Sequence, residues 1–458
     1  MKKLTTRTAG LLLAIGGLWA AQPAWALLPI QHWSQPSGAQ VWLVESPGIP
    51  MVDVQVAFDA GSRRDPDLQS GLATAVALMA SKGVLASGAA PAQDENTLGE
   101  AWADLGASFG AGADDDGFSY ALRSLTDPDL LQRATRLAAR QIAEPSWPQA
   151  IWQRERARWS AAIKESNTRP GTVAAKAFSA AVYGGHPYGQ QTTEATLARI
   201  DVSAMQAFHR TLINACNARV SIVGALNRAQ ADQLVSQLLA PLHARDQAAT
   251  ASRPAGACPQ PAPLPEVSPL ASAQTIDLPF ASAQAHVLIG QPGITRRNPD
   301  FLAVLVGNHI LGGGGFTSRL MEEVREKRGL SYSVSSAFSP GLHAGAFVIG
   351  LQTRADQAPE AIQVSRQVLA DFVARGPTEA ELRAAKDNLV GGFALRIDSN
   401  RKLLSNVANI AWNGLPLDYL DHWTQRVEAL TAADVQAAMA RMLQPERMVT
   451  LVVGGSKP

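Results

Sequence analysis

The strongest constraint on the fold of this chain is an internal duplication in which matching segments stand at an offset that stays near 230 residues. Three separate segments of the first half have counterparts in the second half at this offset. They are 61–67 with 293–300, 200–208 with 430–438, and 220–224 with 450–454. A constant offset across separate segments indicates a repeated structural unit. The sequence therefore predicts two homologous domains.

Each half shows the same order of patterns. An alternating apolar segment, VDVQVAF at 52–58 or AHVLIG at 285–290, precedes an Arg-Arg motif, and helical patterns and a final strand follow. Strands and helices mixed in this way favour an α+β fold. The expected fold class is therefore α+β, with two homologous α+β domains.

The chain has 458 residues, which is too long for one compact core. Its composition indicates where one domain ends and the next begins. Residues 246–272 are rich in Ala, Pro and Ser, which is typical of a linker. We expect this linker to separate an N-terminal domain at 27–245 from a C-terminal domain at 273–458. The formal net charge of +1 gives no bulk electrostatic reason to bind nucleic acid.

The N-terminal segment 1–26 has the features of a secretory signal peptide. Basic residues at positions 2, 3 and 7 precede an apolar core at 9–21, and Ala24-Trp25-Ala26 is a small-x-small cleavage site. The apolar core is too short to span a bilayer comfortably. We expect a periplasmic or secreted protein with no stable membrane anchor after cleavage; an uncleaved anchor is the alternative.

The mature chain has two cysteines, Cys216 and Cys258. An exported protein meets an oxidising compartment, so one disulfide is possible. Two unpaired thiols are an equal alternative, because sequence does not give the distance between the two residues.

An acidic triplet, Asp114 to Asp116, precedes Gly117 between the strand-like segments 109–113 and 118–125. This arrangement is typical of a hairpin turn. The triplet lacks the spaced ligands and bounding Glu of a calcium loop, so we expect a solvated turn.

Residues 58–84 resemble the start of the insulinase, mitochondrial processing peptidase and pitrilysin family of inverted zincin metallopeptidases. A strand ending in Gly61-Ser62-Arg63 precedes a helical segment at 71–82 that ends in Lys82-Gly83. The segment Tyr183-Gly184-Gly185-His186-Pro187-Tyr188-Gly189 is similar to the family's Tyr-x-x-His-Pro-Tyr-Gly. The resemblance covers nearly the whole mature chain and implies a clamshell arrangement of the two domains.

In that family the first helix carries His-x-x-Glu-His, and the resemblance places Thr74, Ala77 and Leu78 at these three positions. The third family ligand is a Glu that follows another Glu by seven residues; Glu155 matches the first Glu, and Ala162 stands at the ligand position. Zinc needs three nitrogen, sulfur or carboxylate ligands. We therefore expect this chain to bind no metal.

Two simpler interpretations concern the same segments. Residues 71–82 would, by themselves, be an ordinary buried helix with Leu72, Val76 and Met79 in the core. No two of the eight histidines stand one helical turn apart, and the context of His186 indicates a structural turn.

The second half carries a glycine run at 312–315 that lacks the Gly-Lys-Ser/Thr ending of a phosphate-binding loop. The longer string from Leu311 to Val334 resembles the family's Leu-Gly-Gly-Gly…Ser-Arg-Leu…Arg-Glu…Gly-Leu-x-Tyr-Ser-Val segment. In the family, an Arg and a Tyr of this segment reach the zinc site of the first half. Arg325 and Tyr332 stand at those positions.

A guanidinium and a phenol suit this task because both can donate hydrogen bonds to the oxyanion formed during peptide hydrolysis. Without the resemblance, Arg325 would be expected to pair with Glu322 or Glu323, and Tyr332 to lie in a strand.

The resemblance implies the non-catalytic subunit of a periplasmic two-chain zinc metallopeptidase. Its partner would be a homologous catalytic subunit with an intact His-x-x-Glu-His, which would hold the zinc that this chain lacks. The substrates would be peptides or unfolded polypeptides, bound as an added edge strand. The alternatives are a binding or assembly protein with no proteolytic role, and a zinc metalloendopeptidase with unrecognised ligands.

Overall fold

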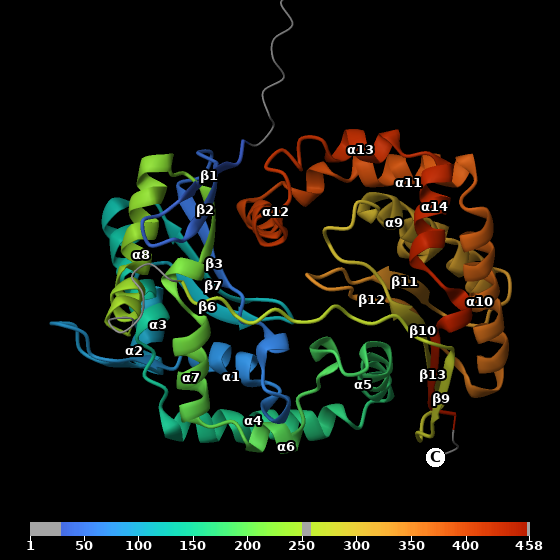
Figure 1. Ribbon diagram of the computed structural model, residues 1–458, viewed down its shortest axis with the longest axis horizontal. Coiled ribbons are helices and arrows are strands. Elements are labelled where there is room, and N and C mark those ends of the chain that lie inside the picture. The colour runs from blue at the N-terminus through green and yellow to red at the C-terminus, as the bar shows by residue number, and fades with distance from the viewer. Residues whose placement is uncertain (1–28, 250–257, 456–458) are drawn as a thin grey trace, which may run out of the picture.

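The computed structural model describes residues 29–249 and 258–455, which form two large mixed sheets with their helices (Figure 1). A short two-stranded sheet of β4 (Gly83–Val84) and β5 (Gln93–Asp94) is also present. The expected signal peptide lies outside the described residues. The first sheet contains β1 (Gln31–Ser34), β2 (Gln40–Glu45), β3 (Met51–Phe58), β6 (Ser108–Ala113), β7 (Phe118–Leu125) and β8 (Arg219–Gly224). The second contains β9 (Gln274–Leu278), β10 (Gln284–Pro292), β11 (Val334–Phe338), β12 (Ala346–Arg354) and β13 (Val449–Val453).

The two sheets share one topology. Their strand orders are β1-β2-β8-β3-β7-β6 and β9-β13-β10-β12-β11, so within these two sheets, as described, only β1 has no counterpart. In both sheets one pair is parallel, β2 with β8 and β9 with β13, and the other pairs are antiparallel. The expected fold class, two homologous α+β domains, is confirmed.

The helices divide between the two halves of the sequence. The first half has α1 (Leu72–Met79), α2 (Glu95–Asp104), α3 (Pro128–Ala143), α4 (Gln149–Ser166), α5 (Pro170–Tyr183), α6 (Glu194–Ala198), α7 (Val202–Leu212) and α8 (Arg228–Ala249). The second has α9 (Phe301–Asn308), α10 (Ala358–Arg375), α11 (Glu379–Gly391), α12 (Asn400–Asn413), α13 (Trp423–Ala429) and α14 (Ala432–Met442). None in the described ranges is long and apolar enough to cross a membrane.

The alternating strand sequences explain the core of the first half. In β7, Phe118, Tyr120 and Leu122 are buried and the residues between them are more exposed. Successive side chains of a strand point to opposite faces, so these three lie on one face. Helices α1, α3, α7 and α8 cover that face and complete the core.

The opposite face of each sheet is covered by a helix from the other half of the sequence. Helix α5 packs its apolar side against β13 of the second sheet, and α12 packs against β2, β3 and β8 of the first. The bounds of α5 and α12 stand at the same offset as the repeated sequence segments, so the two helices are repeat counterparts. The two halves are therefore interlocked, and neither sheet is covered on both faces without the other half.

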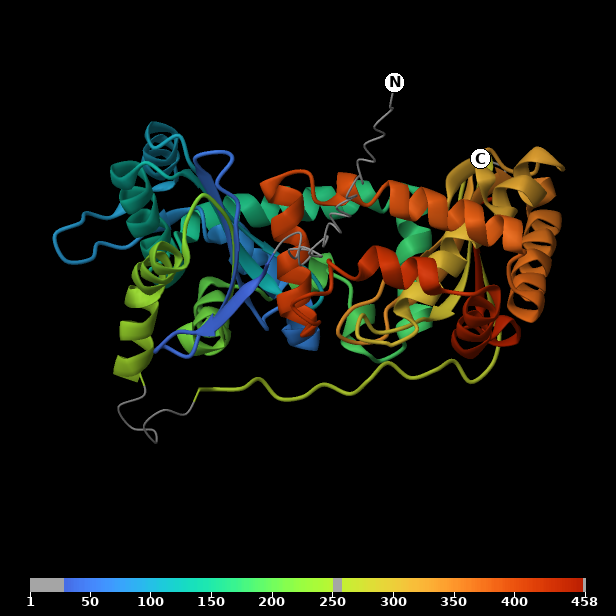
Figure 2. The ribbon, with the colours of Figure 1, turned by 90° about the horizontal axis from the view of Figure 1, so that it is seen from above.

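The linker begins later than its composition indicated. Residues 246–249, expected in the linker, form the last turn of α8, which ends at Ala249. Ala and Gln favour helix, and the Asp246 carboxylate accepts a hydrogen bond from the Ala215 N–H at 2.8 Å. From residue 258 the chain runs along one side of the molecule from the first half to the second, without regular secondary structure up to β9 (Figure 2).

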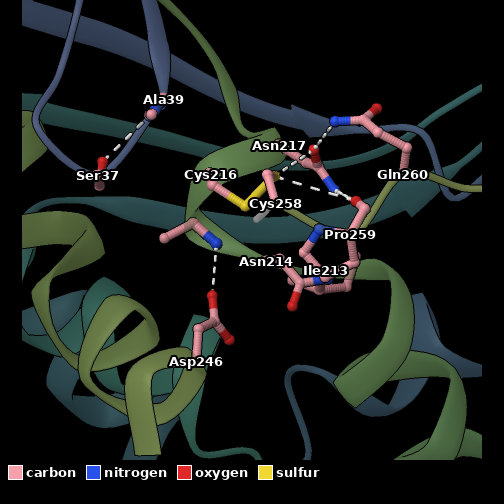
Figure 3. Close-up of a disulfide and its surroundings, with 12 residues drawn as sticks. Ser37, Ala39, Ile213, Asn214, Cys216, Asn217, Asp246, Cys258, Pro259 and Gln260 are labelled. Atoms are coloured by element: carbon pink, nitrogen blue, oxygen red, sulfur yellow. Dashed lines mark hydrogen bonds between the residues drawn. A yellow bond between two sulfur atoms is a disulfide. The ribbon is translucent and has the colours of Figure 1, made fainter. Parts of the chain in front are cut away.

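A disulfide ties this segment to the first half (Figure 3). Cys216 and Cys258 are bonded, with their Cα atoms 5.9 Å apart. Of the two alternatives left open by the sequence, the structure contains the paired form. Beyond the disulfide, Asn217 and Arg64 donate hydrogen bonds to the carbonyl oxygens of Pro259 and Ala262. The segment is thus fixed along the first half before it reaches the second.

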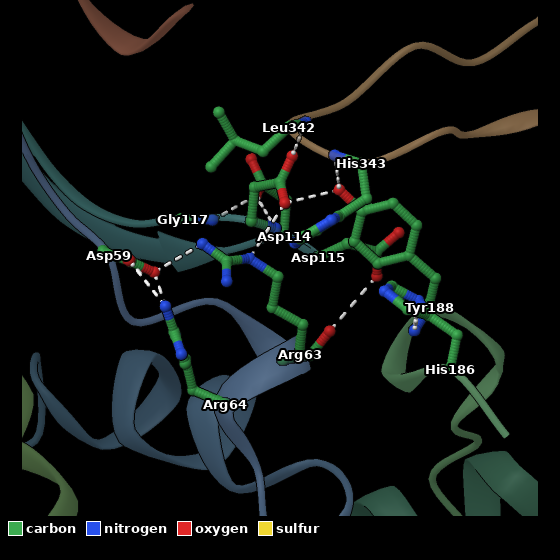
Figure 4. A network of polar contacts seen from close by, with 12 residues as sticks. Asp59, Arg63, Arg64, Asp114, Asp115, Gly117, His186, Tyr188, Leu342 and His343 are labelled. Carbon is green, nitrogen blue, oxygen red and sulfur yellow. Dashed lines mark hydrogen bonds and ion pairs between the residues drawn. The ribbon is translucent and has the colours of Figure 1, made fainter. Parts of the chain in front are cut away.

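A buried carboxylate, Asp116, joins the two halves, and Figure 4 shows its surroundings with Arg63, Tyr188 and Leu342. Its Oδ1 accepts a hydrogen bond from the Tyr188 hydroxyl at 2.5 Å, and its Oδ2 accepts one from the Leu342 N–H at 2.7 Å. The Arg63 guanidinium lies 3.0 Å from the same carboxylate. The His343 N–H donates in turn to the Tyr188 hydroxyl.

The expected solvated turn is therefore wrong for one of its three aspartates. Asp114 and Asp115 are exposed, whereas Asp116 is buried because the loop between β11 and β12 covers it. The hairpin turn itself is present between β6 and β7. His186 also lies in the turn expected for it, where its ring accepts a hydrogen bond from the Tyr188 N–H.

The burial of His209 predicts how acid destabilises the fold. Its Nε2 lies 2.8 Å from the Ile142 carbonyl oxygen, and desolvation lowers its pKa to about 3, so the ring is neutral in the folded state. Below pH 6.5 the unfolded chain binds a proton that the folded chain does not. We expect this residue to reduce the free energy of unfolding by up to roughly 1.4 kcal/mol per pH unit between pH 6.5 and 3.

Urea unfolding at several pH values measures this slope. His209→Gln keeps a donor and an acceptor without the titration, so it should flatten the slope. His422→Gln changes an exposed histidine and serves as the control. Equal slopes for wild type and His209→Gln would refute the assignment.

Candidate functional site

The helix at the expected metal position is α1, and its first turn is anchored by Asp65. The Asp65 carboxylate accepts hydrogen bonds from the N–H groups of Gly71 and Ala73 at 2.8 and 2.9 Å. Burial is the dominant influence and raises the Asp65 pKa to about 6. Gly71 has φ of 103°, and a Cβ there would lie 2.8 Å from the Thr192 side chain. Glycine is therefore required where the chain enters α1.

The vacated positions on α1 carry no metal ligand. Thr74 is exposed, Leu78 is half-buried, and Ala77 is 8% exposed. The expected core residues Leu72, Val76 and Met79 are all buried. No group of three or more His, Cys, Asp or Glu side chains able to hold a metal ion occurs among residues 29–249 and 258–455.

Glu155 is the one acidic position retained from the family pattern, and basic side chains surround its carboxylate. Its carboxylate lies 2.6 Å from Arg154, 3.2 Å from Arg158 and 3.9 Å from Lys82. Lys82 and Arg154 also contact Glu95, at 3.1 and 2.7 Å. The hydrogen bond from Arg154 is the main reason that the Glu155 pKa is lowered. This ion cluster engages the Glu155 carboxylate and joins the end of α1 to α2 and α4.

Ala162 lies two turns beyond Glu155 on α4 and is exposed. Its methyl group offers no donor atom, so α4 supplies no ligand at that position.

In the second half, Arg325 and Tyr332 lie together. The guanidinium carbon of Arg325 is 4.9 Å from the centroid of the Tyr332 ring and 4.7 Å from that of Phe316. Its only ion pair in the described chain is with Glu326 at 3.3 Å, whereas Glu322 and Glu323 pair with Lys327. Tyr332 is 84% exposed and precedes β11 instead of lying in a strand.

The glycine run is explained by close packing. A Cβ on Gly312 would lie 2.5 Å from the backbone nitrogen of Ser336 on β11, and one on Gly314 would lie 2.7 Å from the His309 carbonyl oxygen. The run therefore brings the loop before Arg325 against the sheet. This loop also places Phe316, which is 69% exposed and which the sequence did not single out.

The two expected parts of the site are not joined within this chain. Among the described residues, no hydrogen bond, ion pair or ring contact links Arg325 or Tyr332 to α1. Tyr332 instead borders a cavity of about 700 Å3 that is lined by the N-terminal part of α5 and by β10, β11 and β12 of the second sheet.

The fold is a duplicated α+β unit, and its helix α1 has no donor side chains at the positions expected to hold a metal. These features define a metallopeptidase-like protein without its metal donors. Comparisons with known proteins agree. The family models described as "Insulinase (Peptidase family M16)" and "Peptidase M16 inactive domain" match residues 40–196 and 199–389. A solved structure, a peptidase M16 inactive domain from Pseudomonas fluorescens, has a TM-score of 0.85 and 33% identity, covering 94% of this chain and 100% of that chain.

Curated relatives match shorter parts. An uncharacterised zinc protease of Mycobacterium leprae is 34% identical over 173 residues, 37% of this chain and 38% of the relative. A non-peptidase homolog of Helicobacter pylori is 32% identical over 156 residues, 33% of this chain and 35% of the relative. This chain therefore spans little more than a third of the length of each.

The chain belongs to the insulinase family, peptidase family M16. Because α1 and α4 carry no metal donor at the vacated positions, it is a pseudopeptidase-type member of that family.

The emptied positions lead to a metal-binding prediction. We expect the mature chain, purified alone, to hold no stoichiometric zinc and to cleave no unfolded peptide, because Thr74, Ala77, Leu78 and Ala162 offer no adequate ligand. Elemental analysis and a peptidase assay measure this. The matched variant restores all four positions as T74H/A77E/L78H/A162E and should gain zinc. One tightly bound zinc per wild-type chain with chelator-sensitive activity would contradict the prediction.

Proposed function

We propose that this chain is the non-catalytic subunit of a two-chain zinc metallopeptidase and supplies Arg325 and Tyr332 to the zinc site of a homologous catalytic subunit. The observation that carries the proposal is the unequal state of the two halves. The positions of the metal ligands carry no donor side chains. By contrast, Arg325 and Tyr332 lie in contact with each other, and Tyr332 is 84% exposed. The partner would carry the intact His-x-x-Glu-His and the zinc.

The geometry of the pair suits stabilisation of a charged transition state. Phe316 and Tyr332 lie against the Arg325 guanidinium, which limits its motion. In the described chain the Tyr332 hydroxyl makes no hydrogen bond, so it is free to donate to a substrate oxygen. Donors held in place before the reaction stabilise an oxyanion without reorganisation cost.

The proposed substrates are peptides or unfolded polypeptides. Strand β6, with the sequence SFGAGA, lies at the edge of the first sheet and contacts α1. An edge strand has backbone N–H and C=O groups available for an added strand, and small side chains leave room for it. Such pairing recognises backbone more than sequence, which suits varied unfolded chains.

The proposed location is the periplasm or the cell exterior. The supporting observations are the signal-like residues 1–26 and the Cys216–Cys258 disulfide, which needs an oxidising compartment to persist.

A second candidate is a binding or assembly protein with no proteolytic role. The ion cluster around Glu155 favours it, because this retained carboxylate is engaged in holding three elements together. The exposed Tyr332 has no evident purpose in that case, so we place this candidate second.

Substitutions at the pair distinguish the two. In the complex with its catalytic partner, Tyr332→Phe removes one hydroxyl and should lower turnover on an unfolded peptide by about a hundredfold or more. Arg325→Lys should also lower turnover, because an ammonium does not reproduce the planar guanidinium. Zinc content of the partner should not change, since neither residue is a ligand.

The control is Arg328→Lys, which alters a nearby arginine that is paired with Glu323. Complex formation is followed in parallel by size-exclusion chromatography. If Tyr332→Phe and Arg325→Lys assemble and cleave like wild type, the catalytic role is wrong and the second candidate gains support.

A further inference from the structure

The two exchanged helices cover their sheets in chemically different ways. Under α5, the second sheet presents apolar side chains from three neighbouring strands. They are Leu288 on β10, Val348 on β12, and Val449 and Leu451 on β13. Around Phe178 this interface is a packed apolar layer, and towards the N-terminal part of α5 it borders the cavity of about 700 Å3 that Tyr332 also lines.

The matched positions under α12 are polar. In the first sheet Gln55 pairs with Ser221, as Leu288 pairs with Leu451 in the second. Ala57 lies between Ser119 and Arg219 in the first sheet, as Gly290 lies between Val348 and Val449 in the second. The counterparts of the four apolar residues are therefore Gln55, Ser119, Arg219 and Ser221. The same fold thus tolerates apolar side chains at these four positions, where the first sheet has polar ones. The apolar contact with α12 lies elsewhere on the first sheet, where Trp42, Val44 and Val223 are buried in one cluster with α12 residues.

The helices α5 and α12 also differ, because α5 has a bulky apolar residue where α12 has a small one. On α5, Phe178 packs so closely on the second sheet that its Cζ lies 2.8 Å from the position of a Cβ on Gly290. Its counterpart on α12, at the offset that relates the two helices, is Ala408. Where Phe178 fills the second interface, a cavity of about 430 Å3 lies between α12 and the first sheet and is bordered by Ala408. This volume lies in the range of small-molecule sites.

A cation without a carboxylate partner lines this cavity. The Arg219 guanidinium carbon lies 4.6 Å from the centroid of the Trp412 ring, and within the described chain Arg219 forms no ion pair or hydrogen bond. Desolvation is the main reason that the Arg219 pKa is lowered; Asp59, which is already paired with Arg64, opposes this only in part. A half-buried guanidinium costs free energy unless an anion offsets it.

Two further groups point to a polar ligand. Asn413 is 3% exposed and borders the cavity, and its Oδ1 has no hydrogen-bond partner in the described chain. Ser221 is 2% exposed, and no hydrogen bond of its hydroxyl to another described residue occurs. Buried polar atoms are usually satisfied, so these atoms are suited to contact a bound molecule.

A further part of the cavity lining is acidic. It is formed by the β6–β7 turn with Asp114 and Asp115, neither of which has a cationic partner among the described residues. These two adjacent carboxylates, which have no cationic partner in the described chain, would repel a phosphate or other polyanion. A ligand with both charges matches the cavity better.

We propose that the cavity between α12 and the first sheet binds a small zwitterion, a free amino acid or short peptide, with its carboxylate at Arg219 and its ammonium group at Asp114 and Asp115. The site is separate from Arg325 and Tyr332 and does not depend on the proposed peptidase role.

Calorimetric titration of the wild-type mature chain tests the proposal without any substitution. The probes are the dipeptide Ala-Ala, its C-terminal amide, and its N-acetyl form. Ala-Ala should bind, and each blocked form should bind at least about tenfold more weakly, since each loses a charge-assisted contact. No binding of Ala-Ala at millimolar concentration, or equal binding of the three probes, would overturn the proposal.

Two variants then locate the site. Arg219→Met removes the charge and keeps much of the length, and Ala57→Gly/Ala408→Phe copies the filled interface of the second half. Both should lose binding of Ala-Ala by tenfold or more. Arg228→Met is the matched control, because Arg228 stacks on Trp33 in a similar way outside the cavity. Wild-type affinity in either cavity variant, with folding confirmed by circular dichroism, would place the site elsewhere and refute the assignment.

Discussion

The structure depends on the reciprocal packing of α5 and α12. Each sheet has an apolar face covered by its own helices and a second face that would be open without the helix of the other half. Burial of apolar area is the main stabilising contribution to such contacts. The two repeats therefore fold as one interlocked body, and the disulfide-tied segment and the Asp116 contacts hold further points of the same junction.

Helix α1 keeps its structure although it has no metal-binding side chains at the expected positions. Helix α1 keeps its anchoring carboxylate and its buried face, while the positions that would face a metal are aliphatic or a hydroxyl. The cluster of Lys82, Glu95, Arg154 and Glu155 holds the end of the helix without any ion. Stability and metal binding are separable here because different faces of α1 serve them.

The duplication also provides an internal comparison. Matched positions under α5 and α12 have equivalent strand pairing, yet under α5 Phe178 and aliphatic residues pack at these positions, and under α12 the same place is a cavity lined by Arg219. Close packing is the ordinary condition of a protein interior, so a polar cavity at a position that can be filled calls for a reason in function. The exposed Arg325–Tyr332 pair lies on the other repeat. The two repeats have therefore diverged in different surfaces.

The sequence by itself determined the duplication, the α+β class, the hairpin turn and the extent of β7, because these depend on repeated motifs and on local periodicity. The emptied donor positions were located by the resemblance to the insulinase family. The sequence did not determine that α5 and α12 change places, that Asp116 is buried, that Cys216 meets Cys258 or that 246–249 stay helical. Nor did it single out Phe316 or Arg219. Each of these depends on which surfaces distant segments bring together. Only the tertiary structure decided them, because a side chain's burial and partners are set by contacts far away in the sequence.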